Sequence, residues 1–234
     1  MSTFESRKKQ RELNEKLIKF ALVSAAIISI LTTFGILFSI LFEAIEFFKL
    51  RSFWYFITGA TWSPGVIGSQ FGALPIFAGT FVITLIALGV AIPIGLGSAI
   101  YMSEYASPKT RDYLKPILEV LAGIPSVDYG FFAAITIAPL VVKVAETFGL
   151  EATFNSALAS GIVMGIMIIP TISSLSDDVI RAVPDSQRKA AFGLGMTHGE
   201  TIKNIVLPSA MPGIISASLL ALSKALGETM IVVM

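Results

Sequence analysis

Three ionisable residues lie well inside apolar stretches of the chain, away from the cytoplasmic ends of these stretches, and they are the first candidates for chemistry. They are Asp128, Lys224 and Glu228. An ionised side chain at mid-membrane costs roughly 2.5–3.5 kcal/mol even on insertion scales, so such residues commonly serve a function. Lys224 and Glu228 are four positions apart, so on a helix they share one face and can pair. The pattern predicts a polar seam along a transport pathway.

A packing role accounts for the same three residues. Lys224 and Glu228 would then satisfy each other and fix the packing of their helix. Asp128 would bond to a neighbouring hydroxyl group such as that of Ser126 or Tyr129. Both interpretations stay open at this point.

The segment between Pro184 and Pro208 has the most specific local pattern of the chain. A short helix is predicted to begin at Asp185, because an aspartate can cap the first turn with its carboxylate. Gly193 and Gly195 are expected to end this helix. Two short helices with small residues on their surface would suit docking into a groove of a partner protein.

A second short helix is predicted directly after these glycines. Thr197 and Glu200 have the spacing of a capping box, in which each side chain binds the backbone N–H group of the other residue. The helix is expected to run from His198 to about Val206. Pro208 then leads into the next apolar stretch.

The composition places these residues in a membrane protein. The chain has 234 residues, of which 54% are hydrophobic and 14% charged, and its mean hydropathy is +0.80. Soluble domains average about 25% charged residues. A net charge of +1 argues against nucleic-acid binding. With no Cys and one His, the sequence offers no thiolate site and little imidazole chemistry, so we expect no metal, no cofactor and no catalytic residue.

Five stretches are long and apolar enough to cross a bilayer as helices, which takes about 20 residues. We therefore predict an all-α integral membrane protein, a polytopic helical bundle. It would consist of a cytoplasmic N-terminal segment, residues 1–17, and a transmembrane domain, residues 18–234. The last stretch has no capping signal, so we expect the chain to be cut off inside it and a further span to follow. The predicted spans are residues 18–42, 74–101, 116–142, 155–176 and 211–234.

The distribution of basic residues predicts that the N-terminus is cytoplasmic. With that orientation, 13 Lys and Arg residues lie in cytoplasmic segments or at their boundary, and three lie outside. Cytoplasmic loops carry the excess of positive charge. Residues 177–210 then form a cytoplasmic loop, and Trp54 and Trp62 lie at the outer interface, where a short helix is expected near residues 52–58.

Glycines and prolines inside the spans predict how the helices meet. Gly161 and Gly165 are four residues apart, a spacing that lets two helices approach closely. Four prolines interrupt the spans, and they either break helices along a pathway or reflect the general frequency of proline in membrane helices. They are Pro93, Pro125, Pro139 and Pro170.

The loop between the fourth and fifth spans resembles the EAA loop of ABC importer permeases at every spacing. The matching residues are Ala190, Ala191, Gly195, Ile205, Leu207 and Pro208. The resemblance implies that this loop docks in a cleft of a cytoplasmic ATPase subunit. Lys189 stands where the family has glutamate. The resemblance therefore does not imply, at this position, an ionic contact of the kind that a glutamate would form with the ATPase.

From about residue 66 onward the chain is similar to the C-type permease subunit of the phosphate-specific (Pst) transporters. The similarity lies in residues 68–72, 121–126 and 225–230. It implies a permease for inorganic phosphate in the bacterial inner membrane, with six core spans. The implied partners are a second permease subunit in a heterodimer, cytoplasmic ATP-binding subunits, an external phosphate-binding protein and membrane lipid, with no nucleic acid.

Two positions depart from the Pst pattern. Lys224 replaces a residue that is commonly arginine, and it keeps the charge but loses the bidentate fork that suits an oxyanion. Asp128 replaces a residue that is commonly apolar. The predicted spans contain one central basic residue, Lys224, and two central carboxylates, Asp128 and Glu228. Electrostatics alone therefore does not predict an anionic substrate.

A second hypothesis comes from another class of protein. A secondary transporter or channel would use Asp128, Lys224 and Glu228 as an ion or proton relay, but it would not need the docking loop at residues 189–208. A structural subunit of a membrane assembly would explain the spans and not the loop. No Gly-rich nucleotide-binding loop occurs in the sequence, so the ATPase is expected to be a separate polypeptide.

Overall fold

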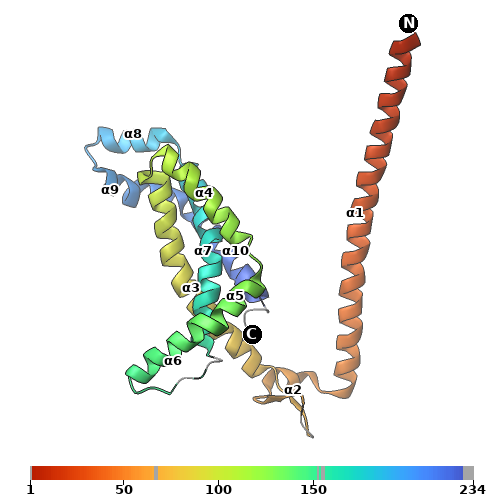
Figure 1. Ribbon diagram of the computed structural model, residues 1–234, viewed down its shortest axis with the longest axis vertical. Coiled ribbons are helices and arrows are strands. Elements are labelled where there is room, and N and C mark those ends of the chain that lie inside the picture. Colours follow the sequence, from red (N-terminus) through yellow and green to blue (C-terminus); the bar gives the residue numbers. More distant parts are fainter. Residues whose placement is uncertain (1, 66–67, 152, 154–155, 229–234) are drawn as a thin grey trace. The chain divides into compact units, whose positions relative to one another are not determined.

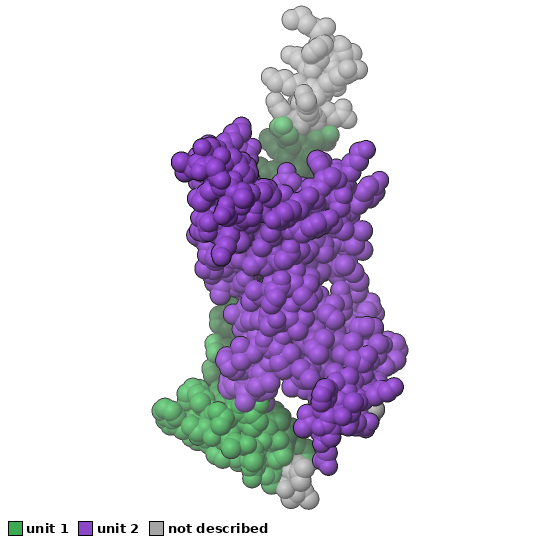
Figure 2. Space-filling view, turned by 90° about the vertical axis from the view of Figure 1, so that its left-hand side faces the viewer, with its two compact units in different colours: residues 1–75 green, residues 76–234 purple. Residues whose placement is uncertain are grey.

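The computed structural model describes residues 2–65, 68–151, 153 and 156–228. It forms two compact units, residues 1–75 and residues 76–234 (Figure 2). Nearly all of the described chain is helical, and five of its helical segments are long and apolar enough to cross a membrane, which confirms the predicted all-α class. These segments are Asn14–Leu50, Leu74–Tyr105, Ser126–Thr147, Ala157–Arg181 and His198–Gly227.

The first unit contains one long helix, one short helix and a small hairpin. The short helix α2 lies where a helix was predicted near residues 52–58, and the apolar side chains of α1 are exposed, as on a helix that faces lipid. In the hairpin, Trp62 stands opposite Phe71. The elements are α1 (Ser2–Leu50), α2 (Phe53–Thr58), β1 (Trp62–Ser63) and β2 (Gln70–Phe71).

Edge-to-face contacts between aromatic rings join the end of α1 to α2 and β2 in the first unit. The ring centroid of Phe47 lies 5.5 Å from that of Phe56 on α2 and 5.8 Å from that of Phe71 on β2. Both pairs are edge-to-face, an arrangement that aromatic rings favour. The end of α1, helix α2 and strand β2 therefore pack against one another through these aromatic side chains.

The second unit is a bundle of helices interrupted by π-helical turns (Figure 1). Its helices are α3 (Leu74–Ile100), α4 (Pro108–Ala122), α5 (Ser126–Phe132), α6 (Ala138–Thr147), α7 (Ala157–Arg181), α8 (Asp185–Gly193), α9 (His198–Thr201) and α10 (Leu207–Gly227). Its π-helical turns are η1 (Tyr101–Tyr105), η2 (Ala133–Ile137) and η3 (Ile202–Val206).

Helix α7 is the centre of this bundle, and α3, α4 and α10 pack around it. In the most apolar part of α7, 56% of the residues are buried, whereas 22% are buried in the corresponding part of the segment that contains α3. The main core cluster joins three helices and includes Ala87 and Ala91 of α3, Ile168 and Ile172 of α7, and Ala221 of α10. Small residues on α3 and α10 thus face large ones on α7.

Gly161 and Gly165 bring α7 close to α3, which confirms the predicted close approach. A Cβ atom on Gly161 would lie 2.7 Å from the Cβ atom of Ile86, and one on Gly165 would lie 2.9 Å from the carbonyl oxygen of Ala87. Real Cβ atoms do not come this near to other heavy atoms. Gly95 on α3 meets Ile172 in the same way, at 2.9 Å.

The third predicted span, residues 116–142, is not one helix. Residues 108–122 form α4, and a break at Gly123, Ile124 and Pro125 separates it from α5. Pro125 disfavours helical geometry at the residue before it and cannot donate a backbone hydrogen bond. The part of this region that is long and apolar enough to cross a membrane is Ser126–Thr147.

The fifth predicted span, residues 211–234, is also displaced. The helical run begins at His198, continues through η3 into α10 and ends at Gly227. Residues 229–234 lie outside the described part of the chain. Glycine has about 1 kcal/mol less helix propensity than alanine, which favours an end at Gly227.

Two of the π turns accommodate prolines inside continuous helical runs. η2 precedes Pro139, the second residue of α6, and η3 precedes Pro208, the second residue of α10. A proline ring clashes with the carbonyl group four residues earlier and leaves it without a donor. A wider π turn displaces that carbonyl group, so the helix continues across the proline.

Candidate functional site

Residues 184–208, the α8–α9 loop, lie at the end of the second unit where α3 ends and α4 begins (Figure 1). Pro184 is the N-cap of α8, with φ −59°, and Asp185 is its first helical residue. The predicted capping role of Asp185 is therefore wrong, because the fixed φ of Pro184 already starts the helix. A carboxylate in the first turn still interacts favourably with the helix dipole.

Gly195 ends α8 in a left-handed turn. Its φ is +82°. The N–H group of Gly195 donates to the carbonyl oxygen of Phe192 at 3.0 Å, and that of Met196 donates to Ala191 at 3.1 Å. This pair of bonds is a Schellman motif, which favours glycine at the left-handed position. Gly193, which was also expected to end the helix, is the last residue of α8.

The predicted capping box of α9 is present. Thr197 Oγ1 accepts the N–H group of Glu200 at 3.4 Å, and Glu200 Oε2 accepts the N–H group of Thr197 at 2.8 Å. The helix does not stop near Val206, because η3 carries it into α10. The loop is thus joined to the last span by uninterrupted helix.

A groove of about 440 Å³ opens between α8 and the junction of η3 with α10. It includes four of the seven predicted docking residues. Lys189 and Gly195 are exposed outside the groove, and Leu207 packs against a core cluster beneath the loop. The small side chains at the surface leave room for an inserted side chain. The lining residues are Gln187, Ala190, Ala191, Leu194, Met196, Asn204, Ile205, Pro208 and Ser209.

The three predicted pathway charges lie at helix ends. Asp128 is exposed in the first turn of α5, and Lys224 is exposed in the last turn of α10. Glu228 is half-buried just beyond α10, with extended backbone (φ −81°, ψ 118°). The predicted helical face shared by Lys224 and Glu228 is wrong, because the helix ends between them.

The ion pairs of the described residues do not include Asp128 or Lys224. Each charge is stabilised by its helix end, since acids favour the first turn and bases the last. Both side chains therefore face outward from this chain, where another molecule can meet them.

A buried ion pair that sequence reasoning missed joins α4 to α7. Arg111 Nη2 lies 2.7 Å from Asp177 Oδ2, and Lys115 pairs with the neighbouring Asp178. The side chain of Asp177 is fully buried, and its hydrogen bond raises the pKa of Arg111, against the effect of burial. Removing one partner of a buried pair costs about 3–5 kcal/mol. Two features of the sequence could have indicated this pair. Asp177 and Asp178 are adjacent at the end of an apolar span, and Arg111 and Lys115 are basic residues four positions apart.

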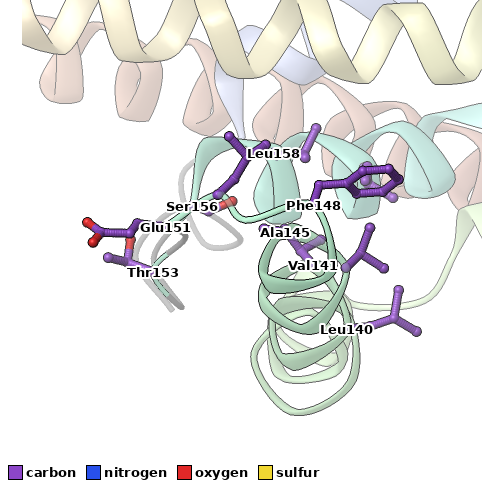
Figure 3. A pocket seen from close by; sticks show the side chains of 11 residues that line it. Leu140, Val141, Ala145, Phe148, Glu151, Thr153, Ser156 and Leu158 are labelled. Carbon is purple, nitrogen blue, oxygen red and sulfur yellow. The ribbon is translucent and has the colours of Figure 1, made fainter.

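A second hollow, of about 580 Å³, lies between α6 and the beginning of α7 (Figure 3). Its lining is mostly apolar and includes Leu140, Val141, Phe148 and Leu158. Among the described residues that line it, none is basic, and Glu151 is acidic. These described side chains therefore supply no positive charge for an anion.

Comparison with known proteins matches residues 91–234 to the family described as "Binding-protein-dependent transport system inner membrane component". The chain is 32% identical over 231 residues to the "Probable ABC transporter permease protein YqgH" of Bacillus subtilis, covering 98% of this chain and 74% of that protein. It is 35% identical over 192 residues to a "Phosphate transport system permease protein PstC" of Mesorhizobium japonicum.

The match to the Mesorhizobium protein covers 76% of this chain and 58% of that protein. The match to PstC 1 of Mycobacterium tuberculosis is 33% identical over 209 residues, and it covers 77% of this chain and 62% of that protein. The chain thus spans less than two thirds of these PstC proteins. Among solved structures, it is similar to the MetNI methionine ABC transporter, with a TM-score of 0.46, 19% identity, and coverage of 67% of this chain and 68% of that chain.

Proposed function

This chain belongs to the family of binding-protein-dependent transport system inner membrane components, and from that membership we propose that it is the permease subunit of an ATP-driven importer of inorganic phosphate. It is a multi-pass inner-membrane protein. The phosphate assignment rests on its identity of 33–35% to PstC permeases over about three quarters of the chain.

The α8–α9 loop is the structural feature that best supports an ATP-driven importer. It has a capped helix, an exposed groove with small residues and an uninterrupted helical connection to α10. A secondary transporter or channel has no use for such a surface. In this proposal a helix or loop of the ATPase subunit contacts Ala190, Ala191 and the groove around them. The permease itself binds no nucleotide and catalyses no reaction.

The proposed assembly contains four kinds of subunit. A second permease forms a heterodimer with this chain, two ATP-binding subunits dock on the cytoplasmic face, and an external phosphate-binding protein delivers the substrate. Lys224, exposed in the last turn of α10, and Glu228, half-buried just beyond that helix, contribute to the substrate path. Lys224 supplies a positive charge for the anion, and a carboxylate can accept a hydrogen bond from protonated phosphate.

Uptake by a reconstituted transporter tests this proposal. The full-length permease, its partner permease and its ATPase are placed in proteoliposomes with ATP inside and phosphate-loaded binding protein outside. We expect uptake of radiolabelled phosphate that stops when ATP is replaced by ADP, whereas sulfate is not taken up. Uptake that proceeds without ATPase and follows a proton gradient would instead support the relay hypothesis.

The proposed orientation, with a cytoplasmic N-terminus, has its own test. Because the printed sequence has no cysteine, single cysteines at Thr147 and Lys203 can be labelled selectively, and both residues are exposed in the chain. An impermeant maleimide should label Thr147→Cys in intact cells and should label Lys203→Cys only after permeabilisation. Labelling in the reverse order would contradict the orientation and the position of the docking loop.

A further inference from the structure

Arg188 joins three separate elements at the end of the second unit that carries the α8–α9 loop. It lies on α8, and its Nη2 atom donates to Glu104 Oε1 of η1 at 2.8 Å and to the carbonyl oxygen of Ile180 of α7 at 2.9 Å. Its Nη1 atom donates to the carbonyl oxygen of Val183. One guanidinium group thus contacts the end of α3, through η1, and the end of α7.

The pair of Arg188 and Glu104 is largely shielded from water. The side chain of Glu104 is 5% exposed and that of Arg188 is 16% exposed. Asp185 is a weaker partner of Arg188, because it lies 3.4 Å away and its side chain is 82% exposed. A lysine could not bind these acceptors together, because it lacks the planar array of five donors. These contacts therefore favour arginine over lysine at position 188.

A histidine of α9 binds the same π turn. His198 Nε2 lies 3.2 Å from the carbonyl oxygen of Glu104, and the imidazole ring meets the ring of Tyr105 edge-on at 5.2 Å. The imidazole ring also stacks on Phe192 of α8, with the ring centroids 6.1 Å apart. Both helices of the loop are therefore attached to η1.

Helix α8 has two faces with different neighbours. Arg188 and Phe192, four residues apart, lie on the side attached to η1 and α9. Gln187, Ala190 and Leu194 line the open groove. A force applied to the groove therefore reaches the end of α3 through the opposite face of the same short helix.

We propose that Arg188, through Glu104, is the positioning residue that transmits displacement of the α8–α9 loop to the end of α3. The inference rests on the proposed function, since it takes the groove as the place where an ATPase applies force. Coupling between sites needs a contiguous physical network that both sites can bias. The Arg188–Glu104 pair is the buried ionic link in that network.

Measurement of the coupling ratio in the complete reconstituted transporter tests this role. For Arg188→Gln and for Glu104→Gln, we expect phosphate uptake per ATP hydrolysed to fall about 5- to 150-fold, while ATPase binding and hydrolysis stay on the order of the wild-type values. Arg188→Lys should be intermediate. Arg181→Gln is the matched control, because Arg181 is exposed at the end of α7 and forms no ion pair or side-chain hydrogen bond within the described residues.

Hydrogen exchange separates failure of this inference from failure of the proposed function. ATPase binding to the wild-type complex should protect backbone amides both in α8 and in residues 101–105, whereas in Glu104→Gln only α8 should be protected. A variant that keeps the wild-type coupling ratio and the protection of residues 101–105 overturns the role of Arg188. Absence of ATPase binding to the wild-type protein overturns the proposed function.

Discussion

Replacing Glu228 by glutamine is expected to reduce ATP-driven phosphate uptake by about 10- to 150-fold while leaving insertion and assembly intact. The variant keeps the shape of the side chain and removes its charge. A charge-assisted hydrogen bond contributes about 1.5–3 kcal/mol, and that energy, if lost only in the transition state, gives a rate effect of this size. Uptake into proteoliposomes and co-purification of all subunits are the two measurements.

Lys224→Met should give a similar loss, and Lys224→Arg should retain most of the activity, because it keeps the positive charge. Lys143→Met is the matched control, since Lys143 is an exposed lysine of α6. If Glu228→Gln transports at the wild-type rate in the full-length protein, the pathway assignment is wrong. Loss of assembly instead of uptake would indicate that these charges serve packing.

Gly195→Trp is expected to prevent association of the ATPase without preventing membrane insertion. Among the described residues, apart from the chain neighbours of Gly195, no heavy atom lies within 4 Å of a Cβ atom at this position, so an indole there would collide with a docked partner and not with the permease. The left-handed φ of +82° adds strain, which for an L-residue is about 1–2 kcal/mol. Co-purification of the ATPase from detergent-solubilised membranes measures the effect.

Gly195→Asn separates bulk from strain, because asparagine tolerates left-handed geometry better than other non-glycine residues do. We expect this variant to retain most of its ATPase binding. An undiminished yield of ATPase with Gly195→Trp would remove the α8–α9 loop from the proposed interface. Equal losses with both variants would point to the turn itself and not to the surface that it presents.

Features set by neighbouring residues could be predicted from the sequence. The capping box of Thr197 and Glu200 and the glycine that ends α8 each depend on a few positions in one segment. Local backbone geometry determines them, so spacing alone was sufficient. The number and class of the spans followed from hydropathy in the same way.

Features set by distant residues could not be predicted. Residues 108–115 lie outside the predicted spans, yet they form the first part of α4. Arg111 and Lys115 there bind aspartates of α7 more than 60 positions away. Arg188 and Glu104 are 84 positions apart. Neither side chain has a local pattern that would identify its partner.

The close packing of α7 against α3 determines where a solute can travel. Where a single Cβ atom would already collide, at Gly95, Gly161 and Gly165, a phosphate ion and its hydration shell cannot pass. The interface between α3 and α7 is therefore closed to the substrate at these positions, and in the proposed heterodimer the substrate path follows an exposed surface of this chain, such as the one that carries Lys224. In the proposed heterodimer this chain supplies one side of the pore, and the permeability barrier is a property of the pair.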